Sequence, residues 1–145
     1  MQSIQTILVP TDFSRHSERG LEYASDLARR LGARLHVLHA LHAPTGLITN
    51  ADWWETIRTR ALDGLERARA VAEASGVKCA VTLSDEYPVV AIEQAVATLP
   101  ADLVVIGSRG ATGLEHALLG SVAERTIRAV TCPVITISAH AEQGL

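Results

Sequence analysis

The chain has 145 residues, of which 48% are apolar and 20% charged, and its formal net charge is −3. This composition excludes a disordered chain and predicts one globular domain over residues 1–145. Twelve of the 13 basic residues are arginines interleaved with acidic residues. No nucleic-acid partner is therefore expected, because non-specific nucleic-acid binding needs clustered positive charge.

We expect neither a leader nor a membrane-spanning segment. No apolar run approaches the roughly 18 residues that a membrane-spanning helix needs, so no membrane partner is expected. The first residues read as a strand and not as a basic, then apolar, leader. Cys79 and Cys132 have no CxxC spacing. We therefore expect a cytoplasmic protein with both thiols reduced.

Strand and helix patterns alternate along the whole chain. In chain order we expect a strand at 4–10, a helix at about 14–31, a strand at 34–41, a helix at about 52–75, a strand at 77–83, a helix at about 88–98, a strand at 102–107, a helix at about 121–130 and a strand at 132–138. Ser14 is the expected N-cap of the first helix, and Gly32 the residue that ends it.

Strands joined by helices pair in parallel through right-handed crossovers. The expected fold class is therefore α/β: a single doubly wound, five-stranded parallel sheet in the order 3-2-1-4-5, with helices on both faces. In that order the chain reverses direction between the first and fourth strands. Ligands of open parallel sheets bind at this switch point, beyond the carboxyl ends of the strands.

Two loops meet at the expected switch point. The first strand ends in "VPTDFS", which places Pro10, Thr11 and Asp12 there. The fourth strand runs into "GSRG", residues 107–110, whose glycines allow backbone N–H groups to approach an anion closely. Arg109 could add a charge-assisted contact to a phosphate or a ribose. Asp12 also has a purely local interpretation, as a cap of the first helix.

Gly120 and Ser121 open the last helix. Ser121 with Glu124 fits the capping-box pattern S-x-x-E, so the hydroxyl could serve either the cap or a ligand. Free amides at the positive end of a helix favour a phosphate. The sequence has neither a Walker loop nor a dinucleotide fingerprint after the first strand. A loose surface connection over 107–121 is the alternative interpretation.

The spacing G-x2-G-x9-G-S, together with "ILVPTDFS" and "CPVITI", resembles the nucleotide-binding branch of the universal stress protein family over essentially the whole chain. The resemblance implies an ATP- or AMP-binding domain that usually dimerises. It places Asp12 near the adenosine, the backbone of Ala40 at the adenine and Ile106 beside the nucleoside. It assigns the phosphates to Gly107, Gly110, Gly120, Ser121 and Val122. One departure is Glu86, where family members often carry a glycine.

These features predict a homodimeric, ATP-binding stress-response or regulatory protein, with AMP or ADP as other ligands and Mg²⁺ on the phosphates. Asp12 is the one candidate metal ligand. Hydrolysis is expected to be slow at most, because the loop has no lysine, no carboxylate pair and no evident base, and no catalytic residue is assigned. The apolar strand around Val134–Ile137 is expected to pair with its copy in a second chain. A nucleotide-free interaction module and an ATP-dependent adenylating or pyrophosphatase-type enzyme are the alternatives.

Other chemistry-bearing residues have structural interpretations. His36, His39 and His42 follow one another at intervals of three residues, so neighbouring members point to opposite faces and one regular strand cannot bring all three together around a metal. Trp54 belongs to the apolar stripe of the second helix, and its neighbour Trp53 could cover the preceding loop, with adenine stacking as a minor alternative.

Overall fold

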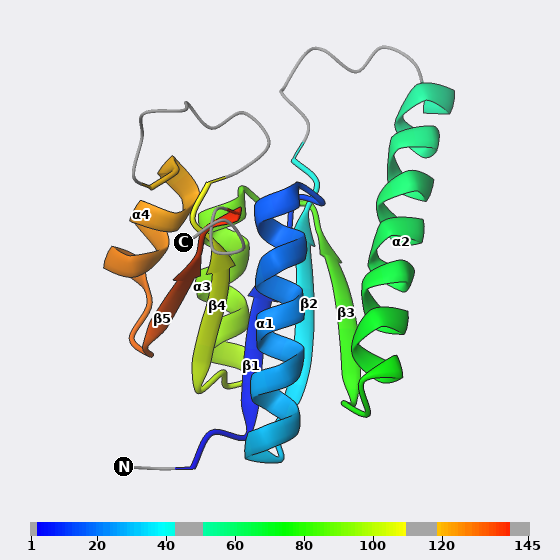
Figure 1. The fold of residues 1–145 in the computed structure, drawn as a ribbon. Coiled ribbons are helices and arrows are strands. Elements are labelled where there is room, and N and C mark those ends of the chain that lie inside the picture. Colours follow the sequence, from blue (N-terminus) through cyan, green and yellow to red (C-terminus); the bar gives the residue numbers. More distant parts are fainter. Residues whose placement is uncertain (1–2, 43–50, 110–118, 140–145) are drawn as a thin grey trace.

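The computed structural model describes residues 3–42, 51–109 and 119–139. Strands and helices alternate as expected (Figure 1). The expected and observed boundaries differ by at most two residues. In chain order the elements are β1 (Thr6–Pro10), α1 (Arg15–Leu31), β2 (Arg34–Ala40), α2 (Ala51–Ala74), β3 (Cys79–Ser84), α3 (Pro88–Thr98), β4 (Leu103–Gly107), α4 (Ser121–Ala129) and β5 (Val134–Ile137).

The five strands form one parallel sheet in the order β3-β2-β1-β4-β5, which confirms the predicted fold class. In the register of the central pairs, Ile7 on β1 lies opposite Leu35 on β2 and Leu103 on β4. The carboxyl ends of β1 and β4 therefore lie side by side, with the direction of winding reversed between them. Pro10–Asp12 and Gly107–Arg109 follow these two strand ends directly.

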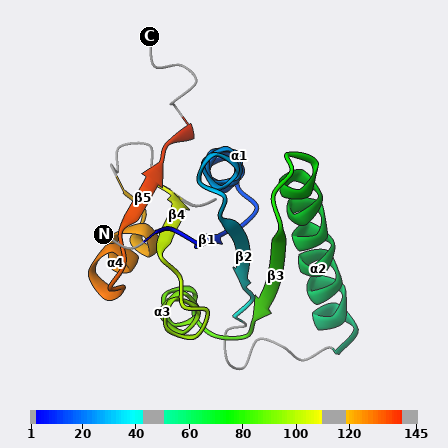
Figure 2. The same cartoon turned by 90° about the horizontal axis from the view of Figure 1, so that it is seen from below.

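Two layers of helices cover the sheet, α1 and α2 on one face and α3 and α4 on the other (Figure 2). Successive side chains of each strand point to opposite faces of the sheet and so belong to two separate cores. Ile7 and Val9 pack toward α1 and α2, whereas Leu8 packs toward α3 and α4. β1 and β4 are buried along their whole length, because a parallel sheet covered on both faces has no solvent side.

The ends of α1 follow the sequence signals. Ser14 is the N-cap, and its side chain accepts a hydrogen bond from the Ser17 backbone N–H. Gly32 ends the helix with φ 68°, in the left-handed conformation that glycine adopts without steric cost. Both expectations are confirmed. Phe13, just before α1, is the one described residue other than glycine with positive φ, at 63°.

Both thiols lie in partly buried positions. Burial raises the pKa of Cys79 to about 11 and also raises that of Cys132. Because a thiolate is the reactive form, neither cysteine is activated for chemistry near neutral pH. No helix in the described ranges has the length and apolar character needed to cross a membrane.

A candidate ligand pocket at the switch point

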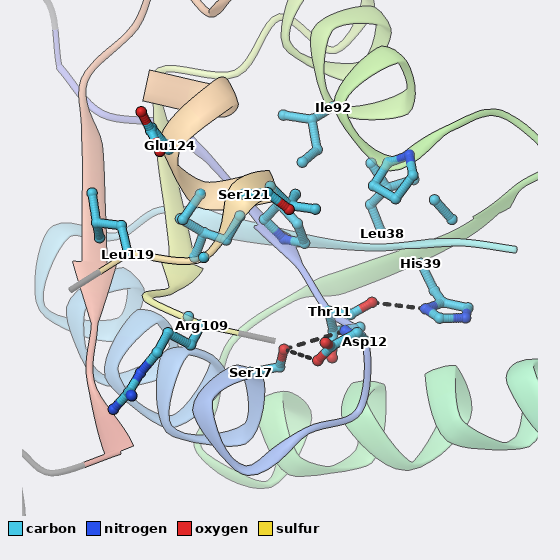
Figure 3. Close-up of a pocket in the computed structure, with 18 residues that line it drawn as sticks. Thr11, Asp12, Ser17, Leu38, His39, Ile92, Arg109, Leu119, Ser121 and Glu124 are labelled. Atoms are coloured by element: carbon cyan, nitrogen blue, oxygen red, sulfur yellow. Dashed lines mark hydrogen bonds between the residues drawn. The ribbon is translucent and has the colours of Figure 1, made fainter. Parts of the chain in front are cut away.

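A pocket of about 500 Å³ opens at the carboxyl edge of the sheet (Figure 3). The loops after β1 and β4 form part of its wall, together with the end of β2 and the first turns of α3 and α4. Its volume lies within the range of small-molecule sites, roughly 300–1,000 Å³. Its position is the switch point at which open α/β sheets bind ligands.

The structure brings nearly all the candidate site residues together around this pocket. The lining includes Pro10, Thr11, Asp12, Ala40, Ile106, Gly107, Arg109, Gly120, Ser121 and Val122. The remaining candidate, Gly110, lies outside the described residues. Segments separated by up to about a hundred residues in the sequence therefore converge on one cavity, as the strand order requires.

Of the two interpretations that the sequence left open for Asp12, the structure supports the pocket wall, since the N-cap of α1 is Ser14. Its Oδ1 accepts hydrogen bonds from the Ser14 backbone N–H at 3.0 Å and from the Ser17 hydroxyl at 2.7 Å. The Ser17 hydroxyl oxygen in turn accepts the backbone N–H of Asp12, at 3.2 Å. These bonds fix the carboxylate at the start of α1 while Asp12 and Ser17 both line the pocket. Asp12 is therefore not the N-cap of α1, which is Ser14, but a group of the pocket wall that holds the cap residue in place.

The start of α4 presents backbone donors to the pocket. The first intrahelical bond runs from the Glu124 N–H to the Gly120 carbonyl oxygen, at 3.0 Å. Ser121, Val122 and Ala123 therefore have N–H groups that the helix itself leaves unpaired, and all three residues line the pocket. The partial positive charge of the helix N-terminus adds to these donors. This is an anion-binding arrangement of the main chain.

The capping box expected at Ser121 is wrong. Gly120 is the N-cap, with φ −74° and ψ 163°, Ser121 is the first helical residue, and no side chain caps the helix. The helix begins one residue too early for the Ser121 hydroxyl to reach an orphan amide of its own first turn. Glu124 instead pairs with Arg128 one turn later, at 3.0 Å.

Gly107 and Gly120 each have a structural role that differs from binding an anion through a free backbone amide. A Cβ on Gly107 would lie 2.8 Å from the backbone carbon of His16 and 2.9 Å from its Cβ. Gly107 is therefore required by the close approach of α1 to β4. The Gly120 N–H donates to the Ser108 carbonyl oxygen at 2.6 Å, so this amide is already engaged.

Arg109 lies at the rim of the pocket. Its side chain extends away from Asp12 and Ser121 in this structure (Figure 3). Since Asp12 and Glu124 also line the cavity, the two carboxylates outnumber this one guanidinium there. Among the described residues, the start of α4 therefore offers an anion more than the side chains of the lining do.

The parts of the wall that come from β2, α3 and β4 include several apolar residues. Leu38 and Ala40 lie two residues apart on β2, Ile92 comes from α3 and Ile106 from β4. Leu38, Ile92 and Ile106 belong to the core that faces α3 and α4 and are buried. The pocket thus has a main-chain donor end and an apolar end, which suits a ligand with an anionic part and a flat, weakly polar part.

The sequence interpretation missed several lining residues: Ser17, Leu38, His39, Pro88, Ile92, Leu119, Ala123 and Glu124. Two of them had a usable signal. Leu38 precedes Ala40 by two residues, so both lie on one face of the strand. Ala123 is the third residue of a helix whose first three amides are unpaired. Ile92 and Pro88 had none, because nothing local shows which turn of α3 reaches the edge of the sheet.

The histidines and tryptophans have separate environments. His36 Nε2 lies 2.6 Å from the Thr82 hydroxyl, and burial lowers the pKa of His36. His39 Nδ1 bonds to the Thr11 carbonyl oxygen at 2.7 Å, and the His42 ring stacks on Tyr87 with centroids 3.7 Å apart. Among the described residues no cluster of histidine, cysteine and acidic side chains could hold a metal ion. Neither Trp53 nor Trp54 lines the pocket.

A doubly wound parallel sheet with a pocket at its switch point is the arrangement in which open α/β proteins bind small ligands, at the carboxyl edge of their strands. The chain belongs to the universal stress protein family, whose sequence model matches residues 3–138.

Two relatives show the extent of the similarity. A universal stress protein of Methanocaldococcus jannaschii, MJ0531, is 32% identical over 136 residues, which cover 90% of this chain and 80% of that protein. A universal stress protein of Thermus aquaticus is 34% identical over 135 residues, covering 92% of this chain and 98% of that protein. The similarity therefore extends over nearly the whole of both chains.

Two solved structures carry ligands. A universal stress protein in complex with cAMP has 25% sequence identity and a TM-score of 0.75, and the match covers 94% of this chain and 98% of that one. The universal stress protein from Archaeoglobus fulgidus in complex with dAMP has 27% identity and a TM-score of 0.70, with 94% and 99% covered. Adenine nucleotides are thus ligands of structural relatives.

Proposed function

We propose that this protein is a stress-response regulator that binds an adenine nucleotide, with ATP as the preferred ligand, in the pocket at the switch point. The observation that carries the proposal is the triplet of helix-unpaired amides at Ser121–Ala123, which line one end of a cavity whose other end is apolar. Relatives of the same fold that bind cAMP and dAMP support adenine as the base.

The two ends of the pocket suggest the orientation of the nucleotide. The phosphates lie at the start of α4, where the main-chain donors and the helix dipole favour negative charge. The base lies against the apolar end, near Leu38, Ile106 and the backbone of Ala40. The ribose then falls near Asp12, whose carboxylate oxygens can accept hydrogen bonds from hydroxyl groups.

Mg²⁺ fits the charges of this site. A triphosphate brings several negative charges to a wall that already contains Asp12 and Glu124. Mg²⁺ is commonly held by one or two carboxylates together with the phosphates of the substrate, and the Asp12 carboxylate is a donor of the right chemistry. When bound, the ion would neutralise phosphate charge.

The pocket favours binding over rapid hydrolysis. Asp12 is held by hydrogen bonds at the start of α1, and Glu124 pairs with Arg128, so both carboxylates are engaged in structural contacts. The function we propose is therefore a nucleotide-dependent change in the surface or assembly of a regulatory protein, with turnover far below the roughly 1 s⁻¹ of a slow ordinary enzyme.

Isothermal titration calorimetry with ATP, AMP and GTP, each with and without Mg²⁺, tests the function. We expect adenine nucleotides to bind, GTP to bind more weakly, and Mg²⁺ to strengthen ATP binding more than AMP binding. Binding should also raise the melting temperature, since a ligand of the native state stabilises it by RT ln(1 + [L]/Kd). No heat and no thermal shift at millimolar nucleotide would favour a nucleotide-free interaction module. Turnover above about 1 s⁻¹ would favour an enzyme.

We further propose that the protein acts in the cytoplasm as a homodimer joined along β5. β5 is an edge strand, all four of its residues are half-buried, and the side chain of Ile127 on neighbouring α4 is 45% exposed. Unpaired apolar edges favour pairing with another strand. Sedimentation equilibrium should give twice the 15.5 kDa mass of the chain, whereas a monomer at all concentrations would contradict the proposal.

A further inference from the structure

Phe13 holds a backbone conformation that its side chain disfavours. Its φ of 63° lies in the left-handed region, which costs energy for any residue with a Cβ. Such a conformation persists only where the surrounding structure enforces it. Phe13 directly follows Thr11 and Asp12, two residues of the pocket wall. The contacts that enforce the conformation of Phe13 therefore also position Thr11 and Asp12 in the pocket wall.

Contacts from three elements hold Phe13 in place. Its backbone N–H donates to the Thr11 hydroxyl oxygen at 3.0 Å. Its ring lies on the imidazole of His39, at the end of β2, with centroids 4.5 Å apart and planes tilted by 37°. The far edge of the ring reaches α2 at Gly64, where a Cβ would lie only 2.7 Å from Phe13 Cε1. The missing side chain of Gly64 thus makes the space that the ring fills.

The ring also connects two parts of the pocket wall. His39 lines the pocket, and its Nδ1 donates to the Thr11 carbonyl oxygen at 2.7 Å. A carbonyl oxygen only accepts, so Nδ1 carries the proton and ties β2 to the loop after β1. Phe13 covers this bond from the α2 side. Displacing the ring would remove one of the contacts that position the His39 ring and, through its bond to Thr11, the loop after β1.

We propose that Phe13 is a positioning residue of the nucleotide pocket: clamped between His39 and Gly64, its ring transmits the placement of α2 to Thr11 and Asp12. This inference rests on the proposed function for its ligand. It adds that the affinity of the pocket for the nucleotide depends in part on the position of α2, although no residue of α2 lines the pocket. A partner or a modification that shifts α2 would then alter nucleotide binding.

The test compares Gly64→Ala, Phe13→Ala and the double variant by calorimetry with Mg·ATP. The added methyl of Gly64→Ala meets the flexible end of the Phe13 ring and not backbone, so the ring moves and the helix stays. We expect each single variant to weaken ATP binding about tenfold, because each removes or displaces the ring that holds the strained backbone beside the pocket wall. The double variant should bind no more weakly than Phe13→Ala, since Gly64 acts only through the ring.

Phe13→Asn and Leu62→Ala are the matched controls. Asparagine tolerates positive φ but has no ring, so Phe13→Asn should bind as weakly as Phe13→Ala. Wild-type affinity in Phe13→Asn would overturn the role of the ring. Leu62 is an exposed residue of the same helix, 45% accessible, and Leu62→Ala should bind ATP as the wild type does. Unchanged affinity in Gly64→Ala would overturn the inference, as would additive losses in the double variant.

A measurement without nucleotide separates this inference from the proposed function. In NMR spectra of the ligand-free protein, Gly64→Ala should shift the backbone amides of Asp12 and Ser14 and the ring signals of His39, while Leu62→Ala leaves them in place. Unmoved signals in Gly64→Ala overturn the positioning role, whatever the ligand. Moved signals in a protein whose wild type binds no nucleotide support the positioning role and reject the nucleotide function instead.

Discussion

Replacing Ser121 with proline should weaken ATP binding roughly thirtyfold while α4 stays folded. Proline removes one of the three helix-unpaired amides, and a lost hydrogen bond to a charged group costs about 2 kcal/mol. The substitution suits the local backbone, because proline is favoured at the first position of a helix. Gly120, which would precede the proline, already has φ −74° and ψ 163°, within the region to which a following proline restricts it.

Ser121→Ala is the control, since it removes the hydroxyl and keeps the amide. The Ser121 hydroxyl does not cap the helix, so Ser121→Ala should retain the stability of the wild type. The ratio of the two ATP dissociation constants, from calorimetry, isolates the contribution of the backbone N–H. Equal affinities for the two variants would show that this amide does not hold the phosphate. Circular dichroism would establish that both variants remain folded.

Gly107→Ala should destabilise the fold by about 2 to 3 kcal/mol, the cost of forcing an extra methyl into a packed core. The new Cβ would come within 3.0 Å of three His16 atoms, two of them backbone, so α1 must move away from β4. Urea unfolding followed by fluorescence or circular dichroism measures the loss as a shift of the midpoint at unchanged slope.

Gly20→Ala is the matched control for this packing argument. Gly20 faces Gly107 across the same contact between α1 and β4, but a Cβ there meets the Gly107 nitrogen at an ordinary 3.5 Å. Since alanine favours a helix over glycine, Gly20→Ala should be neutral or stabilise by up to about 1 kcal/mol. Similar losses in both variants would contradict the specific role of Gly107.

The fold was predictable because local and long-range signals agree. Continuous Val, Ile and Leu in β1 and β4 indicate strands buried on both faces, and the intervening helical stripes impose parallel pairing. The strand order then places Asp12 beside Gly107 without any knowledge of side chains. The C-cap at Gly32 was equally readable, because glycine is the residue that tolerates the left-handed conformation there.

The roles of individual groups were less predictable. Gly107 begins a glycine-rich stretch typical of a phosphate loop. The glycine is required there because a side chain would clash with the backbone of His16, in an element about ninety residues away. The S-x-x-E pattern at Ser121 predicted a cap, yet α4 begins one residue too early for it. His39 was considered only as a metal ligand, a role that the sequence analysis rejected, and its bond to the Thr11 carbonyl appears only once β1 and β2 are paired. The roles of these three residues depend on distances that only the tertiary packing sets.

The most direct test of the central claim is an NMR titration of the backbone amides at the start of α4 with Mg·ATP. We expect the Ser121, Val122 and Ala123 amide protons to move strongly downfield as they donate to phosphate oxygens. The Gly120 amide, already bonded to the Ser108 carbonyl, should move much less. Saturation of binding with these three amides unmoved would contradict the account, because the phosphates would then lie elsewhere.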